Sequence, residues 1–305
     1  MMAPHLLVIG GTGFIGHHLL KAAKRQSWKL TSASLNPPSQ DRHVDGVRYL
    51  LIDLTDASAI RRSLEEEYDY VVNLGGYIDH TLFQSGGRAM IEAQFTALQN
   101  LIETLPRGSL KRFVQIGSSD EYGNVPSPQH EALRENPISP YSLGKVASTH
   151  FLQMLHRTEG FPAVTLRLFL AYGPGQNNKR FLPQIIQGCL QNKEFPTSTG
   201  EQLRDFCYVE DVANAIIQTL TSEEMDGQVF NVASGQPIAI RTVIEQVRDL
   251  IGKGKPNFGA IPYRVGENMS LYADITRILN VLNWRPQVGL EDGLRNTINW
   301  YAERI

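Results

Sequence analysis

A glycine-rich turn near the N-terminus constrains the fold of this chain more than any other feature. Gly10, Gly13 and Gly16 follow the apolar run Leu6–Ile9 and lead into the helical pattern Ile15–Arg25. Between a buried strand and a helix, such a turn lets the backbone approach a pyrophosphate and aims the first helical N–H groups at it. The sequence therefore predicts a dinucleotide site at the first strand-to-helix connection.

Short apolar runs alternate with helical patterns through the first half of the chain. This rhythm predicts an α/β fold with a doubly wound parallel sheet that is covered on both faces. Asp56 is expected to cap the second helix. The expected strands are Leu6–Ile9, Lys29–Ser34, Val47–Ile52, Tyr70–Leu74, Arg112–Ile116 and Ala163–Phe169, and the expected helices are Ile15–Arg25, Ala57–Glu67, Arg88–Leu105 and Tyr141–Thr158.

The rhythm changes after Tyr172, which predicts a second, smaller mixed α/β lobe. We expect a dinucleotide-binding domain over 1–172, to which 206–232 returns, and a substrate-binding lobe over 173–305. The cleft between the two is the expected substrate site. Expected here are the helices Phe181–Gln191, Asp211–Thr221, Ile240–Ile251 and Leu290–Ile305, the strand Val229–Val232, and an irregular stretch Glu194–Arg204.

Composition and charge exclude several classes of partner. The 305 residues carry a net charge of −2, so no basic surplus favours nucleic-acid binding. No apolar run has the length of a membrane helix, and the N-terminus lacks the pattern of a signal peptide. The two cysteines, Cys189 and Cys207, favour a reducing cytoplasm over a disulfide framework. We predict no metal site.

The segment Tyr141-Ser142-Leu143-Gly144-Lys145 carries a candidate acid–base pair. Residues four apart on a helix share a face, so the tyrosine and the lysine lie together. The ammonium group is expected to lower the pKa of the phenol by charge proximity, so that Tyr141 can exchange a proton near neutral pH.

These motifs together resemble the extended short-chain dehydrogenase/reductase superfamily, in particular its sugar-nucleotide epimerases, dehydratases and reductases. The Gly-x-x-Gly-x-x-Gly spacing and the Tyr-x-x-x-Lys pair carry the resemblance, which covers essentially the whole chain. It implies a Rossmann-type fold and a nucleotide-sugar substrate. It also implies that Ser118, counted back from Tyr122-Gly123, joins Tyr141 and Lys145 as a catalytic residue, with its hydroxyl on the reacting oxygen.

The same resemblance implies a set of cofactor-binding residues. The second strand ends Ser34-Leu35-Asn36, without the carboxylate that pairs with a 2′-hydroxyl in NAD sites. We therefore expect NADP(H) as the preferred cofactor and keep NAD(H) open, with Ser34, Asn36 or Arg42 donating to a 2′-phosphate. Asp53 is expected beside the adenine, or alternatively as a helix cap. The expected cofactor-binding residues are Gly10, Gly13, Phe14, Ile15, Gly16, Ser34, Asn36, Asp53, Leu54, Leu74, Gly75, Tyr141 and Lys145.

Two positions in the turn after the fifth strand bear on the reaction. Ser119 stands where many 4,6-dehydratases carry an aspartic acid, and Asp120 stands where they carry a glutamate base. Both are expected to contact substrate. The acid pair for water elimination is not intact, which argues against a dehydratase. A pair shifted by one residue, Asp120-Glu121, is the open alternative.

Three further residues are expected at the substrate. Arg204 and Arg264 match positions that bind the diphosphate in the family, and Glu267 matches a position that binds the ribose. The alternatives for either arginine are a solvated charge or a salt bridge between the lobes. Leu170 replaces an asparagine that usually contacts the sugar. His80 either faces the substrate or is a surface-loop histidine.

The leading hypothesis is an NADPH-dependent reductase of a nucleotide-linked 4-keto-(6-deoxy)hexose, with Tyr141 as the acid. A 4-epimerase with tightly bound NAD uses the same residues and is the second hypothesis, and a 4,6-dehydratase ranks lower. A non-catalytic scaffold ranks lowest because both Tyr141 and Lys145 are present. By resemblance, the helices over 88–105 and 141–158 are expected to pair into a homodimer interface.

Overall fold

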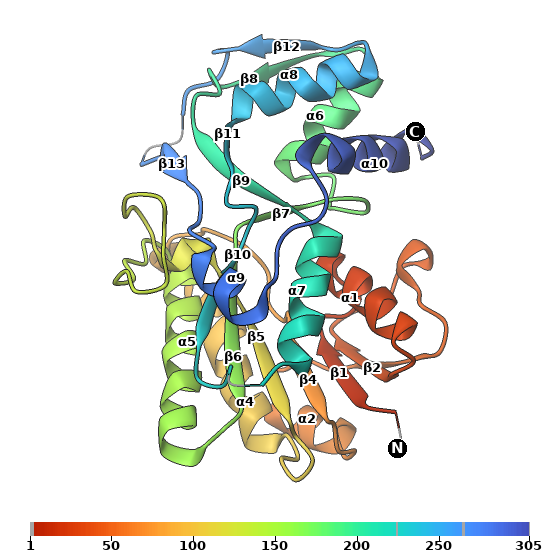
Figure 1. Ribbon diagram of the computed structural model, residues 1–305, viewed down its shortest axis with the longest axis vertical. Helices are drawn as coiled ribbons and strands as arrows, with labels where there is room; N and C mark the ends of the chain where they lie inside the picture. The colour runs from red at the N-terminus through yellow and green to blue at the C-terminus, as the bar shows by residue number, and fades with distance from the viewer. Residues whose placement is uncertain (1–2, 224, 264–265, 305) are drawn as a thin grey trace.

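The computed structural model describes residues 3–223, 225–263 and 266–304. A sheet of seven parallel strands forms its lower body (Figure 1). Its order is β10-β6-β5-β4-β1-β2-β3. These strands are β1 His5–Ile9, β2 Lys29–Ser34, β3 Val47–Leu51, β4 Tyr70–Asn73, β5 Arg112–Ser118, β6 Ala163–Leu168 and β10 Val229–Val232.

Continuous apolar runs make the central strands, because a parallel sheet buries both faces. Residues of β1 and β6 are almost all inaccessible to solvent. The six strands expected before residue 170 are confirmed, and the strand expected at 229–232 joins the same sheet through β6. The fold class expected from the sequence is confirmed.

Helices cover both faces of this sheet. On one face α1 Phe14–Arg25 packs beside α7 Val209–Thr221, and α9 Thr276–Leu282 lies against the edge strand β10 (Figure 1). On the other face lie α2 Ala57–Ser63, α4 Ala97–Thr104 and α5 Pro140–Glu159. Asp56 caps α2 as expected, accepting hydrogen bonds from two backbone N–H groups of the first turn.

Two expected helices differ from the structure in detail. The segment expected as one helix over 88–105 consists of α3 Arg88–Ile91, a π-helical turn Glu92–Thr96 and α4. The helix expected to reach Glu67 ends at Ser63, because the following residues form a loop that brings Glu66 to Lys29 on β2.

The upper lobe is built around the strand β9 Leu203–Tyr208. β9 pairs with β7 Leu170–Tyr172, β11 Pro237–Ala239 and β13 Ser270–Leu271. Its core lies between β9 and the helices α6 Phe181–Leu190, α8 Ile240–Ile251 and α10 Leu290–Ala302 (Figure 1). The stretch expected to be irregular over 194–204 instead contains β8 Glu194–Thr197, which pairs with β12 Lys255–Phe258, and the start of β9.

Two buried aspartates join this lobe to the sheet below. Asp205 on β9 accepts hydrogen bonds from the backbone of Ser234 and Gly235, which follow β10. Asp211 on α7 accepts from Gln287 N and Val288 N at 2.9 and 3.0 Å, just before α10. Among the described residues, no helix is long and apolar enough to cross a bilayer.

Candidate active site

The glycine turn closes tightly between β1 and α1. Gly10 has φ +76°, and its carbonyl accepts a hydrogen bond from Gly13 N at 2.9 Å. A Cβ at Gly16 would fall on the Gly10 carbonyl and lie 2.6 Å from the Gly11 Cα, so only glycine fits. Gly13, the N-cap of α1, supplies no side chain to the first-turn N–H groups. Phe14 and Ile15 begin the helix. This cradle fits a dinucleotide pyrophosphate.

The end of β4 lies against the glycine turn. A Cβ at Gly10 would be 3.1 Å from the Leu74 carbonyl oxygen. Gly75 follows, and the Leu54 side chain approaches it from the end of β3, 3.6 Å from the position a Cβ would take. Leu54, Leu74 and Gly75 therefore line the same carboxyl edge of the sheet, where such folds bind dinucleotides.

The end of β2 meets the glycine turn from the other side. The buried Ser34 Oγ accepts from Thr12 N at 3.4 Å, and Asn36 is exposed. The Arg42 guanidinium donates to Thr12 O at 3.2 Å and to Gly175 O at 2.7 Å. Arg42 therefore lies where it would meet a cofactor ribose, but its side chain bridges the glycine turn to the loop after β7.

Asp53 does not cap a helix. Its Oδ1 accepts hydrogen bonds from Thr55 N at 2.8 Å and Thr55 Oγ1 at 2.7 Å, while Asp56 supplies the cap of α2. The exposed carboxylate stabilises a tight turn after β3. Of the two roles expected for Asp53, the helix cap is therefore wrong, and the position beside the adenine stays a prediction.

Ser118, Tyr141 and Lys145 come together at the carboxyl end of β5. The Ser118 hydroxyl is hydrogen-bonded to the Tyr141 phenol. Lys145 Nζ donates to Ile116 O at 2.8 Å and lies 5.9 Å from the centre of the Tyr141 ring. Ser139 caps α5, with Pro140 at its first position, so the helix begins one residue before Tyr141.

Burial controls the ionisation of both helix residues. It lowers the pKa of Lys145 to about 8, against the opposing effect of Glu121. It raises the pKa of Tyr141, while the hydrogen bond from Ser118 and the charge of Arg180 act in the opposite direction. The expectation that the pKa of Tyr141 is lowered is wrong, because the effect of burial outweighs the charges nearby. Tyr141 is therefore a protonated phenol at neutral pH, the form that donates a proton.

Asp120 and His80 lie beside the phenol. Asp120 Oδ2 is 3.8 Å from His80 Nε2, and the imidazole meets the Tyr141 ring edge-on at 5.8 Å. Burial raises the pKa of Asp120, and the charge of His80 opposes that shift. His80 comes from the loop after β4 and is half exposed, yet it contacts the cluster. Ser119 is buried in the turn between Ser118 and Asp120.

The Glu121 carboxylate is paired in the interior of the protein. It is buried and forms an ion pair with Arg167 on β6, with 2.9 Å between Oε2 and Nε. The alternative in which Asp120 and Glu121 form a shifted acid pair is therefore wrong. A single carboxylate of the turn, that of Asp120, lies beside Tyr141.

The predicted substrate residues Arg204 and Glu267 lie together in the upper lobe. The Arg204 guanidinium forms an ion pair with the Glu267 carboxylate and donates to Leu203 O at 2.8 Å. Both residues belong to the upper lobe, so this is not a salt bridge between lobes. A diphosphate would have to share or displace Glu267. Arg264 lies outside the described residues.

Sequence reasoning missed Arg180, which precedes α6 as its N-cap residue. Its positive charge opposes the rise in the pKa of both Asp120 and Tyr141, and its side chain is exposed. The signal was present in the sequence. A basic run, Lys179-Arg180, directly follows the loop that begins at Gly173 and precedes an apolar helix.

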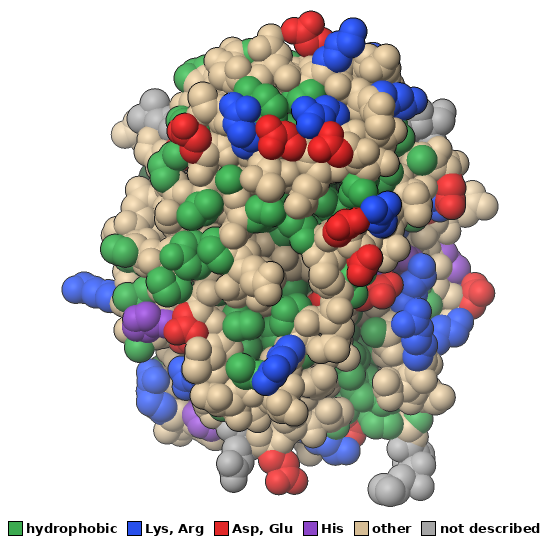
Figure 2. Space-filling view, turned by 45° about the horizontal axis from the view of Figure 1, so that its top comes forward, with side chains coloured by type: hydrophobic (Ala, Val, Ile, Leu, Met, Phe, Trp, Pro, Cys, Tyr) green, Lys and Arg blue, Asp and Glu red, His purple; other side chains and the backbone are tan. Residues whose placement is uncertain are grey.

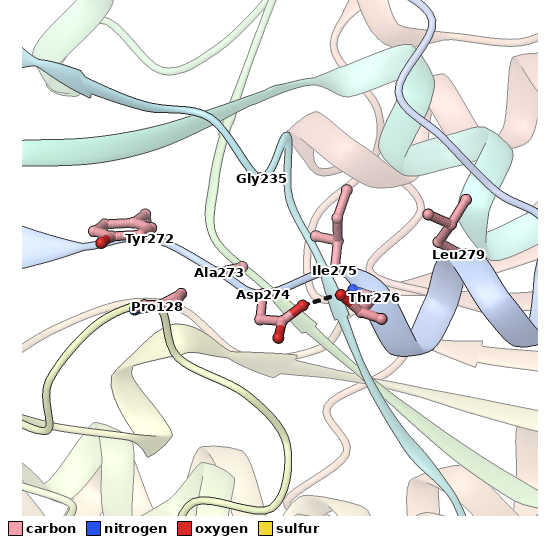
Figure 3. Close-up of a pocket in the computed structure, with 8 residues that line it drawn as sticks. All are labelled: Pro128, Gly235, Tyr272, Ala273, Asp274, Ile275, Thr276 and Leu279. Carbon is pink, nitrogen blue, oxygen red and sulfur yellow. Dashed lines mark hydrogen bonds between the residues drawn. The ribbon is translucent and has the colours of Figure 1, made fainter.

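Away from this cluster, a surface pocket of about 350 Å³ lies beyond the carboxyl end of the edge strand β10, near α9 (Figure 3). Tyr272 and Asp274 are among its lining residues, and Asp274 Oδ1 accepts from Thr276 N at 2.8 Å. Of the predicted site residues that the structure describes, none lines it. On the face shown in Figure 2, basic and acidic side chains are interspersed without an extended basic field.

Comparisons with known proteins agree with this geometry. The chain is 26% identical over 330 residues to a UDP-glucuronate 4-epimerase of Thermodesulfobacterium geofontis (strain OPF15), covering 99% of this chain and 97% of the relative. It is 28% identical over 336 residues to dTDP-glucose 4,6-dehydratase 1 of Escherichia coli (strain K12), covering 97% and 92%.

A solved structure is similar over the same range. MoeE5 in complex with UDP-glucuronic acid and NAD superposes with a TM-score of 0.86 at 25% identity, covering 99% of this chain and all of that one. The family model for the NAD dependent epimerase/dehydratase family matches residues 6–233, from β1 to just past β10. The chain is therefore a member of the NAD-dependent epimerase/dehydratase family, whose members act on sugar nucleotides, and it is an enzyme.

Proposed function

We propose that this enzyme reduces the 4-keto group of a nucleotide-linked (6-deoxy)hexose. The observations that carry the proposal are the buried phenol of Tyr141 beside Ser118 and Lys145, and the end of β2, Ser34-Leu35-Asn36, which lacks a carboxylate. A reductase needs a proton donor at this point, because the carbonyl oxygen becomes a hydroxyl. The bound nicotinamide would supply the hydride.

Each of the three clustered side chains has a separate role in the proposed reduction. Ser118 orients the keto oxygen by a hydrogen bond, and Tyr141 delivers the proton to it. Lys145, whose Nζ is anchored on Ile116 O at 2.8 Å, would hold the ribose next to the nicotinamide and stabilise the phenolate left on Tyr141. Ser119 and Asp120, in the turn after Ser118, would contact the sugar.

The diphosphate would lie between two arginines. Arg204, with Glu267, lies on the upper lobe, and the charge of Arg180, at the start of α6, lowers the pKa of Asp120 against the effect of burial. Guanidinium groups pair well with phosphate oxygens. On this account residues 1–172 and 206–232 hold the cofactor, and the lobe 173–305 holds the nucleotide sugar.

Water elimination has weaker support. It requires a base that removes a proton next to the keto group and an acid that protonates the leaving hydroxyl. Ser119 replaces the acid, and the Glu121 carboxylate is engaged with Arg167 in the interior. Asp120 alone remains, so we rank a 4,6-dehydratase below the other two reactions.

A 4-epimerase is the second candidate, and it is favoured by the similarity to a UDP-glucuronate 4-epimerase over almost the whole length of both chains. Tyr141 would then act first as a base, and the hydride would return to the other face of the same sugar. The same three residues serve both reactions, so the cofactor balance must separate them.

We propose NADP(H) as the preferred cofactor, with NAD(H) as the alternative that the NAD-bound relative supports. The support is the absence of a carboxylate over Ser34-Leu35-Asn36, together with the exposed Asn36 amide.

Ser34→Asp would place a negative charge beside the ribose. We expect it to weaken NADPH binding at least tenfold relative to NADH, measured by fluorescence titration, with Ser34→Asn as the uncharged control. Equal losses for both cofactors would contradict the proposal.

We also propose a cytoplasmic homodimer. Leu143 and Met154 are exposed on α5, and Phe95 meets Phe151 edge-on between α5 and the π-turn. Both cysteines are free and buried, as suits a reducing compartment.

Light scattering on the purified protein tests the assembly, and the double variant Leu143→Glu/Met154→Glu should yield monomers. A wild-type mass of one chain would refute it.

The reaction is tested by a panel of 4-keto-6-deoxyhexoses linked to UDP, dTDP, GDP or CDP. We expect oxidation of NADPH, followed at 340 nm, with at least one of them. NAD that stays tightly bound through purification, with interconversion of 4-epimers and no net cofactor turnover, would favour the epimerase instead.

A further inference from the structure

Glu121 is a buried carboxylate that the proposed reaction does not use. It follows Asp120 in the short turn η4 Ser119–Glu121, and its side chain is wholly inaccessible to solvent. A buried charge costs several kcal/mol unless it is paired and hydrogen-bonded. Its contacts therefore indicate why a carboxylate stands there.

Each contact of the carboxylate reaches a different element of the candidate active site. Oε1 accepts from Ser118 N at 2.9 Å, which fixes the backbone of the residue that orients the substrate. Oε2 accepts from Thr149 Oγ1 at 2.8 Å on α5, the helix that carries Tyr141 and Lys145. Oε2 also accepts from Arg167 Nε at 2.9 Å on β6.

Arg167, on β6, has further contacts besides its ion pair with Glu121. Its guanidinium lies 4.6 Å from the centre of the Tyr122 ring, and its Nη2 donates to Glu135 Oε1 at 2.6 Å. Glu135 is partly exposed and also lies 3.3 Å from His150. Arg167 thus has two carboxylate partners. Glu135 reaches α5 only through the exposed His150, whereas Glu121 contacts both Ser118 and Thr149.

We propose that Glu121 is a positioning residue that joins β5, β6 and α5 through one carboxylate, and thereby sets Ser118 against Tyr141 and keeps a negative charge beside Lys145. The proposal rests on the assignment of Ser118, Tyr141 and Lys145 under the proposed function. It does not depend on which sugar is reduced or epimerised.

The charges around the lysine support an electrostatic part to this role. Burial alone lowers the pKa of Lys145, and Glu121 is the charged group that raises it. Asp120, Glu121 and Arg180 act on the neighbouring phenol of Tyr141, and His80 acts on Asp120. Removing the charge of Glu121 removes the support that keeps Lys145 protonated near neutral pH.

The test compares Glu121→Gln with Glu135→Gln. Both remove one carboxylate partner of Arg167, but only the first touches Ser118 and Thr149. Affinity for NADPH and for NADH is measured by fluorescence titration from pH 6 to 10 on the full-length protein. In the wild type, affinity should fall above about pH 8 as Lys145 loses its proton. Glu121→Gln should move this break point down by about one unit, and Glu135→Gln should leave it in place.

A second variant separates geometry from charge. Thr149→Val removes the hydrogen bond to α5 but keeps the Glu121 charge. It should lower kcat, by up to about 100-fold if Tyr141 moves by an ångström, without moving the break point. An unchanged kcat would contradict the claim that the Glu121 carboxylate positions α5 and Tyr141.

Two results would overturn the proposal as a whole. One is an identical break point in Glu121→Gln, Glu135→Gln and the wild type. The other is an equal loss of thermal stability and activity in both variants, which would make Glu121 a partner of Arg167 and nothing more. A wild-type protein that binds neither cofactor would instead contradict the proposed function.

Discussion

Lys145 shows how one residue can be costly to the fold and necessary to the site. Its ammonium group is buried, and burial lowers its pKa from 10.5 to about 8. A lowered lysine pKa means that the unfolded chain binds more protons between these two values, so stability rises with pH across that window. Below pH 8 the charged lysine destabilises the native state.

Lys145→Met should therefore be more stable than the wild type at pH 7, by up to about 3 kcal/mol, and inactive. The gain should shrink as the pH rises from 8 towards 10.5, because the native lysine is then neutral and the cost of deprotonating it, relative to the unfolded chain, falls with pH. Denaturant unfolding at pH 7 and at pH 10 measures the difference. Lys21→Met, on the surface of α1, is the control. A variant less stable than the wild type at pH 7 would contradict this account of Lys145.

Tyr141 supplies the most direct test of the assigned acid. Tyr141→Phe keeps the ring that meets His80 but removes the hydroxyl bonded to Ser118. Turnover should fall by at least about 100-fold, the scale of a general acid, while affinity for the cofactor stays within a few-fold. Tyr77→Phe, in the exposed loop after β4, is the matched control. If turnover survives in Tyr141→Phe, another group protonates the substrate.

At this scale the sequence predicted the triad but not its surroundings. Tyr141 and Lys145 follow from spacing, because i, i+4 pairs share a helical face, and Ser118 follows from the resemblance to the family. His80 and Arg180 come from loops whose direction is set by tertiary packing, and no periodicity encodes it. Glu121 was visible in the sequence, but which way its side chain turns depends on Arg167, which lies 46 residues further along the chain.

At the scale of elements, the turn from β1 to α1 is fixed by close backbone contact. Gly16→Ala would press a Cβ onto the Gly10 carbonyl, and backbone atoms cannot move aside as a flexible side chain can. We expect a loss of about 1–3 kcal/mol in the free energy of unfolding and at least tenfold weaker cofactor binding. Gly289→Ala, where a Cβ meets nothing within 4 Å, is the control for thermal melting and titration. Wild-type cofactor affinity in Gly16→Ala would show that the turn is not the cradle.

The elements that sequence predicted are those with strong patterns. The central strands of the parallel sheet, such as β1 and β6, are largely apolar runs, and the long helix α5 has clear spacing and a cap. The upper-lobe strands lack such patterns. β13 has two residues, and β9 contains Arg204 and the buried Asp205. Asp205 is tolerated there because Ser234 and Gly235 satisfy its carboxylate, a contact between segments far apart in the sequence.

At the scale of the whole molecule, the cofactor edge and the upper lobe are tied at several points. Arg42 bridges Thr12 and Gly175, and His18 Nε2 is 3.0 Å from Pro174 O. These contacts bring Pro174 and Gly175, in the loop before α6, to the glycine turn. Under the proposed function, the nucleotide sugar would lie between the upper lobe and the carboxyl edge of the sheet.

The central claim, that hydride passes from the cofactor to the keto sugar, is tested most directly with NADPH in which both hydrogens at C4 of the nicotinamide are replaced by deuterium. Incubated with a 4-keto-6-deoxyhexose nucleotide, the enzyme should yield a 4-hydroxy product with one deuterium at sugar C4, formed in equal amount to the NADP⁺ released. Mass spectrometry and NMR of the product give both values. A product free of deuterium, or 4-epimers that interconvert without NADP⁺ release, would contradict the account.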